Sequence, residues 1–188
     1  MKQGQEMEEN TFPQDEHFDD ALPADDGMLP HSTEAEEAVL GAILINQDAY
    51  NEVGQIISRK DFFIRKHQWL WDAFTALSDS EQPVDVQTVA EELDRHDHLQ
   101  DIGGKVFLYS LTGKTPSSMH AEAYASIVAE KSVRRRLIEA ADKMTELAMD
   151  QKQPLDNVLD SAEQAIFDVS EKRDRKEVQP ISSVVGEI

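Results

Sequence analysis

The chain contains no cysteine among its 188 residues, which excludes a disulfide framework and metal sites built from thiolates. It also lacks any apolar run close to the roughly 18 residues that a membrane helix requires, and it begins with no secretory apolar segment. We therefore expect a cytoplasmic protein without membrane contact. A domain of this size buries about 68–70% of its unfolded surface, so it needs no covalent staples.

Basic residues are scarce. The chain has 18 lysines and arginines against 38 aspartates and glutamates, which gives a net charge of -20. Residues 1–30 alone hold nine acidic residues and one lysine. Because tight nonspecific binding to DNA requires several phosphate contacts from lysine or arginine, we expect weak or no direct DNA binding.

Strand signals are weak, since no alternation is sustained and no Asn-Gly or Asp-Gly turn separates two strand-like runs. The sequence therefore predicts an all-α fold. A first helix is expected within residues 30–44, where Thr33 is the predicted N-cap and Glu36 completes a capping box. Its apolar stripe consists of Val39, Leu40, Ile43 and Leu44.

Three further helices are predicted between residues 48 and 93. Asp48 is expected to cap a short helix, an aromatic helix follows, and Asp85 should cap a helix with apolar residues at i, i+3, i+4 and i+7. Gly103-Gly104 breaks the chain before a last apolar run at residues 106–111. An aromatic face is predicted from Phe63, His67, Leu70, Trp71, Phe74 and Leu77, and the short helix should carry Val53, Ile56 and Ile57.

The last third predicts an antiparallel helical hairpin. A long helix is expected from Ser117 or Ser118 to about Met149, followed by a break at residues 151–154 and a second helix. Apolar residues in both step by three and four, the spacing of a coiled-coil seam. Alternatively, both helices pack on the globular part. The seam residues, also the candidates for self-association, are Leu137, Ala141, Met144, Ala148, Leu155, Leu159, Ala162, Ile166 and Val169.

The C-terminal residues predict a linker and the start of a further amphipathic helix, which begins at Pro180. Its apolar face would comprise Ile181, Val184, Val185 and Ile188. The expected organisation is a disordered acidic tail over 1–29, a compact helical globular subdomain over 30–116, a long helix and hairpin over 117–172, and a linker with the start of a linker helix over 173–188.

No catalytic, cofactor or metal site is predicted. Residues 113–115 (Gly-Lys-Thr) look like the end of a P-loop, but Leu108 stands where that motif requires glycine. Residues 96–98 (His-Asp-His) have no third and fourth ligand at recognisable spacing, and His67 is interpreted as a packed core residue.

Three consecutive arginines, Arg134 to Arg136, suggest either nucleic-acid contact or a salt-bridged helix. Successive side chains on a helix point about 100° apart, so the three form no single patch. Glu130 and Glu139 each lie four residues from one of these arginines, which favours i, i+4 ion pairs.

The order of these landmarks resembles the N-terminal domain of the bacterial replicative DNA helicases of the DnaB family. The resemblance covers roughly residues 29 to 188 and rests on an ordered set rather than on one motif. Its landmarks are PHSTEAEEAVLGAIL at 30–44, Asp61-Phe62-Phe63, Pro83-Val84-Asp85, Gly103-Gly104, Thr115-Pro116-Ser117 and Arg135-Arg136-Leu137-Ile138.

This resemblance implies partners rather than chemistry. Hairpins would pair between subunits, as dimers or a trimer of dimers within a hexameric ring, and the domain would bind the C-terminal domain of primase; a helicase loader is a further candidate. The linker helix would dock on a neighbouring motor domain. ATP and Mg²⁺ would be used only by that motor domain, which this chain lacks, so the chain alone should not be an enzyme. The alternatives are a stand-alone nucleic-acid-binding domain and a regulator that joins helicase rings without a motor.

Overall fold

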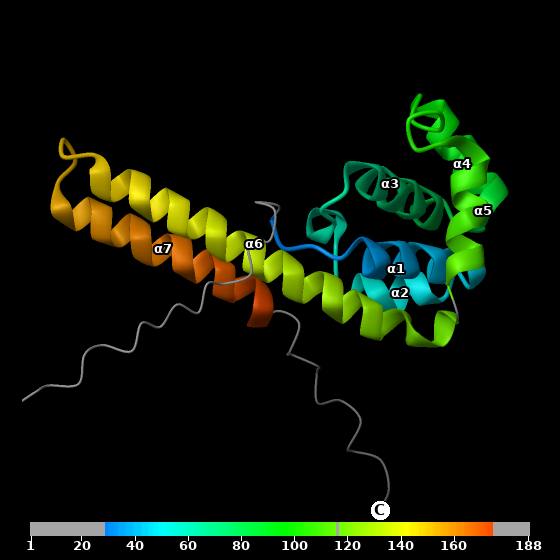
Figure 1. Cartoon of the computed structure of the whole chain (residues 1–188), viewed down its shortest axis with the longest axis horizontal. Coiled ribbons are helices and arrows are strands. Elements are labelled where there is room, and N and C mark those ends of the chain that lie inside the picture. The colour runs from blue at the N-terminus through cyan, green and yellow to red at the C-terminus, as the bar shows by residue number, and fades with distance from the viewer. Residues whose placement is uncertain (1–28, 116, 175–188) are drawn as a thin grey trace, which may run out of the picture.

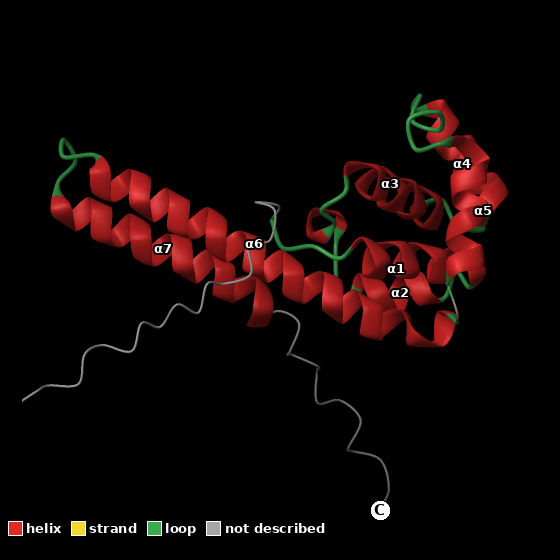
Figure 2. Cartoon of the chain, viewed as in Figure 1, coloured by secondary structure: helices red, strands yellow, loops and turns green. Residues whose placement is uncertain are grey.

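The computed structural model describes residues 29–115 and 117–174. Within these residues every regular element is helical (Figure 2), which confirms the predicted all-α class. Helices α1 to α5 form one group, and the paired helices α6 and α7 extend away from it as an antiparallel hairpin (Figure 1). The predicted acidic tail and the predicted linker helix lie outside the described residues.

The elements follow one another with short connections. In chain order they are α1 (Thr33–Ile45), α2 (Ala49–Gly54), the 3-10 turn η1 (Arg59–Asp61), α3 (Arg65–Asp79), α4 (Val86–Arg95), α5 (Gly104–Lys114), the 3-10 turn η2 (Ser118–His120), α6 (Ala121–Met149) and α7 (Leu155–Asp174).

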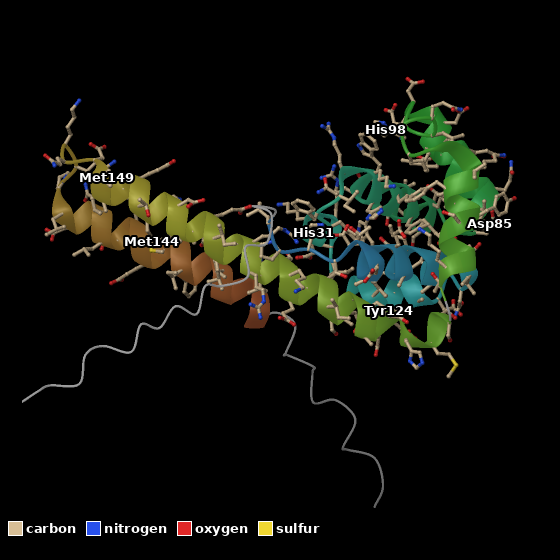
Figure 3. The ribbon with its side chains drawn as sticks, in the orientation of Figure 1. His31, Asp85, His98, Tyr124, Met144 and Met149 are labelled. Atoms are coloured by element: carbon tan, nitrogen blue, oxygen red, sulfur yellow. The ribbon has the colours of Figure 1, made fainter. Side chains whose placement is uncertain are left out.

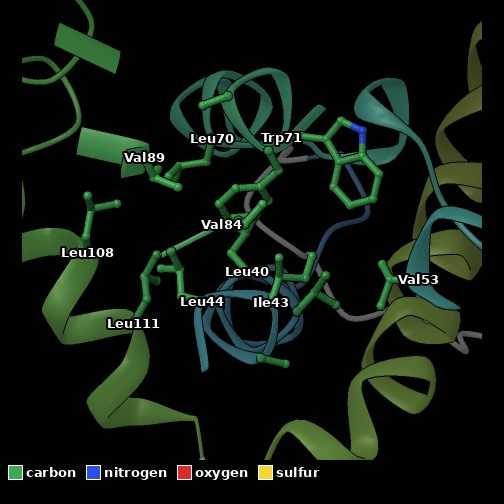
Figure 4. Packing of buried hydrophobic residues seen from close by; sticks show 14 of the residues in the cluster. Leu40, Ile43, Leu44, Val53, Leu70, Trp71, Val84, Val89, Leu108 and Leu111 are labelled. Atoms are coloured by element: carbon green, nitrogen blue, oxygen red, sulfur yellow. The ribbon is translucent and has the colours of Figure 1, made fainter. Parts of the chain in front are cut away.

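Helix α1 lies at the centre of the globular part, where it contacts α2, α3, α5 and α6. Val39, Leu40 and Ile43 on it are completely buried. Figure 4 shows Leu40, Ile43 and Leu44 packed among side chains of the neighbouring helices. A helix covered on most sides can be apolar nearly all round, and each fully buried aliphatic side chain contributes about 1.5–3 kcal/mol.

Two predicted helix starts are wrong in detail. Ser32, not Thr33, caps α1, because its hydroxyl accepts the Ala35 N–H at 3.2 Å. Glu36 therefore takes no part in a capping box. Asp48 stands at the N-cap of α2 without a side-chain bond, and Asn46 instead accepts the Asp48 N–H. Helix α2 ends at Gly54, so the predicted Ile56 and Ile57 follow it.

Other local predictions are confirmed. Asp85 caps α4 by accepting the N–H groups of Gln87 and Thr88 at 2.8 and 3.0 Å. The glycines before α5 have positive φ, 102° at Gly103 and 68° at Gly104, a conformation that side chains with a Cβ rarely adopt. The predicted face of α3 is buried at His67, Leu70, Trp71, Phe74 and Leu77, while Phe63 precedes the helix.

Gly41 permits the close approach of α1 and α5. A Cβ at this position would collide with the Thr115 hydroxyl and lie 2.5 Å from the Leu111 carbonyl oxygen. We expect Gly41→Ala to lower the free energy of unfolding by about 1–3 kcal/mol, because overpacking forces the two backbones apart. Urea denaturation followed by circular dichroism measures this change.

Gly113 provides the matched control. It lies in α5, and a Cβ there would meet no atom within 4 Å. Gly113→Ala should therefore stabilise the protein by up to about 1 kcal/mol through helix propensity. Equal effects of the two substitutions would contradict the close packing at Gly41.

Candidate protein-interaction surface

The hairpin is joined to the globular part by a buried polar contact on α6. Arg135 donates from Nη1 to the Pro30 carbonyl oxygen at 2.7 Å and from Nη2 to the Asp61 carbonyl oxygen. One turn earlier, Ser132 donates to the Asp61 carboxylate at 2.7 Å. Burial lowers the pKa of Arg135, while the charges of Glu36 and Asp61 oppose that change. These bonds fix the start of the hairpin against η1 and the chain before α1.

A second buried group, Glu36, holds the loop that receives Arg135. Its two carboxylate oxygens accept the backbone N–H groups of Phe63 and Ile64 at 2.8 and 3.3 Å. The same carboxylate lies 2.8 Å from Nδ1 of His67, and both side chains are at most 1% exposed. His67 is thus a packed core residue, as predicted.

The arginine triplet divides into different roles. Arg134 forms the predicted ion pair with Glu130 at 2.8 Å, on the surface. The expected pair between Arg135 and Glu139 is not formed, because Arg135 turns inward to two carbonyl oxygens.

The contact between α6 and α7 is formed mainly by small side chains, whereas the sequence predicts larger ones there. Ala140 of α6 and Ala165 and Val169 of α7 are buried there, with Val133 packed against them. Of the nine predicted seam residues only Val169 is buried, and Met144 and Ala162 are half-buried. The other six are exposed to solvent and do not line the contact between α6 and α7: Leu137, Ala141, Ala148, Leu155, Leu159 and Ile166. Their predicted role in self-association stays a prediction.

Most of these six residues share one side of the hairpin. Leu137 follows Arg136, Ala141 follows Ala140 and Leu159 follows Val158, so each lies one position after a residue that faces the partner helix. One position is a rotation of about 100°. Because the helices run antiparallel, the same rotation turns both sets toward the same side. Ala148 and Ile166 are placed in the same way, after Leu147 and Ala165. We call the residues Leu137, Ala141, Ala148, Leu159 and Ile166 the apolar side.

The opposite side of the hairpin is polar. Glu139 and Lys143 each lie one position before a residue that faces α7, and Gln164 and Asp168 are placed equivalently on α7. A shallow pocket of about 210 Å³ opens there between the helices, lined by residues that include Arg136 and Asp168. The hairpin is therefore two-sided. Met149 marks its far end in Figure 3.

Residues 113–115 do not form a phosphate cradle. Lys114 pairs with Glu37 at 2.8 Å, and the Thr115 hydroxyl donates to the Leu111 carbonyl oxygen. His96 lies 3.2 Å from Glu92, and the ring of His98 stacks on Trp69.

The described ranges offer no site for a metal ion, since they contain no group of three or more suitable side chains. No helix among these residues is long and apolar enough to cross a membrane. The predicted docking residues Ile181, Val184, Val185 and Ile188 lie outside the described part of the chain. What the described residues do present is a helical domain with a projecting, firmly attached hairpin, which is the form of a protein-interaction domain.

The comparisons with known proteins agree with this form. The model of the DnaB-like helicase N terminal domain matches residues 28–130. The replicative DNA helicase DnaC of Bacillus subtilis is 33% identical over 160 residues, which is 85% of this chain and 35% of the relative. The replicative DNA helicase DnaB of Geobacillus stearothermophilus is 37% identical over 144 residues, or 77% of this chain and 32% of the relative.

Solved structures lead to the same family. The crystal structure of the N-terminal domain of DnaB helicase from Mycobacterium tuberculosis superposes with a TM-score of 0.72 at 36% identity and covers 75% of this chain and 99% of that one. A DnaB-like replicative helicase, studied with its interactions with primase, shares the fold with a TM-score of 0.61 at 21% identity, over 79% of this chain and 36% of that one. The chain belongs to the DnaB-like helicase N-terminal domain family. It spans about a third of the length of the curated relatives.

The anchoring role of Arg135 can be tested against its neighbour. Arg135→Ala removes a buried charge-assisted contact to two carbonyl oxygens, so we expect the free energy of unfolding to fall by about 2–4 kcal/mol. Arg134→Ala removes an exposed pair and should cost at most about 1 kcal/mol. Thermal denaturation of both variants compares them, and similar losses would refute the buried anchor.

Proposed function

We propose that this chain is the ring-assembly and primase-interacting module of a replicative DNA helicase, and that it self-associates through the apolar side of its hairpin. The observation that carries this proposal is the exposure of large apolar residues on that side: Leu159 is 54% and Leu137 46% exposed. Exposed apolar surface gathered on one face is characteristic of protein interfaces.

The geometry suits pairing with a second copy. A side formed by two antiparallel helices is long and nearly flat, and two such sides facing each other would make a four-helix bundle. A two-fold arrangement brings the same residues together from both copies. Dimers of this kind could be the units from which a ring is built.

The primase partner is proposed from the relationship. The DnaB-like helicase with which this chain shares its fold has interactions with primase, and the corresponding partner here would be the primase C-terminal domain. A helicase loader is a further candidate. ATP hydrolysis and strand separation would belong to a motor domain outside the matched residues, consistent with a chain that spans about a third of its relatives.

Introducing a charged residue on the apolar side tests whether this side is the self-association surface. Leu159→Asp would place an unpaired carboxylate in the apolar contact, where its burial is costly. We expect the mass in solution, measured by light scattering, to fall toward the 21.2 kDa of one chain, with helicity unchanged because Leu159 is exposed within the protomer.

Val106→Asp is the matched control. Val106 is 80% exposed on α5, away from the hairpin, so the same substitution there should leave the mass unchanged. If Leu159→Asp also leaves the mass unchanged, the apolar side is not the contact between copies.

Primase binding is tested separately. Calorimetric titration of the intact chain with an isolated primase C-terminal domain at tens of micromolar should give saturable heat, whereas the same titration with ATP should give none. An absence of heat with the primase domain would count against this part of the proposal, whatever the oligomeric state.

A further inference from the structure

Basic residues are concentrated at one place in this acidic chain. Although acidic residues outnumber basic ones by 38 to 18 in the chain, four basic residues stand within residues 59–66. They surround the connection between η1 and α3. We call Arg59, Lys60, Arg65 and Lys66 the basic rim.

Arg59, Arg65 and Lys66 have defined contacts with described residues, of which only that of Arg59 neutralises its charge. Arg59 pairs with Asp72 at 2.7 Å, and both side chains are about half exposed (47% and 48%). Arg65 lies over the ring of Trp69 at 5.4 Å, and Lys66 lies 3.8 Å from the ring centre of Phe107. Within residues 29–115 and 117–174, Arg59 is the one member of the rim that is paired with a carboxylate. The charges of Lys60, Arg65 and Lys66 are therefore open to a negatively charged partner.

The N-terminal segment enters the structure beside this rim. The Pro30 carbonyl oxygen accepts from Arg135, and the ring of His31 stacks on Phe63 with 4.4 Å between the ring centres. Figure 3 shows His31 where the globular helices meet the hairpin. Every rim residue is within four positions of Phe63, which places its Cα at most about 14 Å away along the chain.

The segment that enters here is the most acidic part of the chain. Residues 1–28 contain nine acidic residues and one lysine. A segment tethered next to a site reaches it at an effective concentration on the order of millimolar, so even a weak charge contact is occupied. We propose that residues 1–28 of this chain dock on the basic rim of the same molecule.

Zero-length cross-linking of the intact chain tests this contact. A carbodiimide joins a carboxylate to a lysine amine in direct contact, with loss of water, and mass spectrometry identifies the joined residues. We expect carboxylates of residues 6–26 to link mainly to Lys60 and Lys66. Lys143 and Lys152 on the hairpin serve as internal references, because 28 extended residues span about 90 Å and do not exclude them by length. An even spread over all lysines would overturn the proposal.

Two double variants distinguish the effect of the rim from the effect of the chain's overall charge. Arg59→Gln with Arg65→Gln should lower the yield of links from the acidic segment to Lys60 by about fivefold. Arg95→Gln with Arg134→Gln removes the same charge from exposed paired arginines elsewhere and should leave that yield unchanged. Raising the ionic strength from about 0.1 to 1 M shortens the screening length from about 10 to 3 Å and should abolish the links. Links insensitive to the rim variant or to salt would refute the contact.

Mixing chains labelled with ¹⁴N and ¹⁵N identifies the molecule that supplies the segment. Links within one isotope only support docking on the same chain. Links of mixed isotope would assign the rim to the segment of a second copy and overturn the proposal. The measurement is independent of self-association, since the Leu159→Asp variant should give the same links.

Discussion

The buried carboxylate of Glu36 is the interaction on which the domain depends. It lies 1% exposed on the central helix and holds Phe63, Ile64 and His67. An isolated buried charge costs several kcal/mol, so this carboxylate is compatible with the fold only when these partners surround it. The loop fixed in this way then presents Asp61 to Ser132 and Arg135. A carboxylate on α1 therefore helps to fix the direction of the hairpin, through the loop that it holds and through its charge, which acts on Arg135.

Glu36 is also the residue whose role the local sequence pattern predicts wrongly. A Ser or Thr followed three residues later by Glu predicts a capping box, and the pattern Thr33–Glu36 satisfies it. The rule considers only local partners, and nothing local indicates that two N–H groups some 27 and 28 positions later require an acceptor. Where the determining contacts are local, as at Asp85, or the apolar face is strongly periodic, as in α3, the sequence was sufficient. The sequence offers Arg135 a surface partner, Glu139, four residues later, and nothing local indicates that its side chain turns instead to the carbonyl oxygens of Pro30 and Asp61.

The hairpin illustrates a second limit. Its existence followed from the spacing of three and four and from the break before Pro154. Its rotation did not, because the apolar stripe is wider than the contact between the helices. The spacing of three and four predicts Leu137 and Leu159 in the seam, but the same spacing fits the neighbouring face. In the structure small residues, Ala140 and Ala165, allow the helices to approach closely, and the larger residues remain outside. Periodicity predicts which residues share a face but not which of two adjacent faces is covered within the protomer.

The charge of the hairpin determines how two copies can pair through the apolar side. Residues 142–168, which form the outer part of the hairpin, contain seven acidic residues and two lysines, so two hairpins brought together repel each other. That repulsion acts over about 10 Å at 0.1 M salt, whereas apolar burial contributes about 25 cal/mol per Å² only at contact. The proposed pairing therefore requires that the two apolar sides fit closely. Two copies that meet in a poor alignment repel each other and bury little apolar surface. Such an interface is selective because its charges oppose association and its shape supplies the affinity. The basic residues Arg134 to Arg136 lie at the other end of the hairpin, where Arg135 joins it to the globular part.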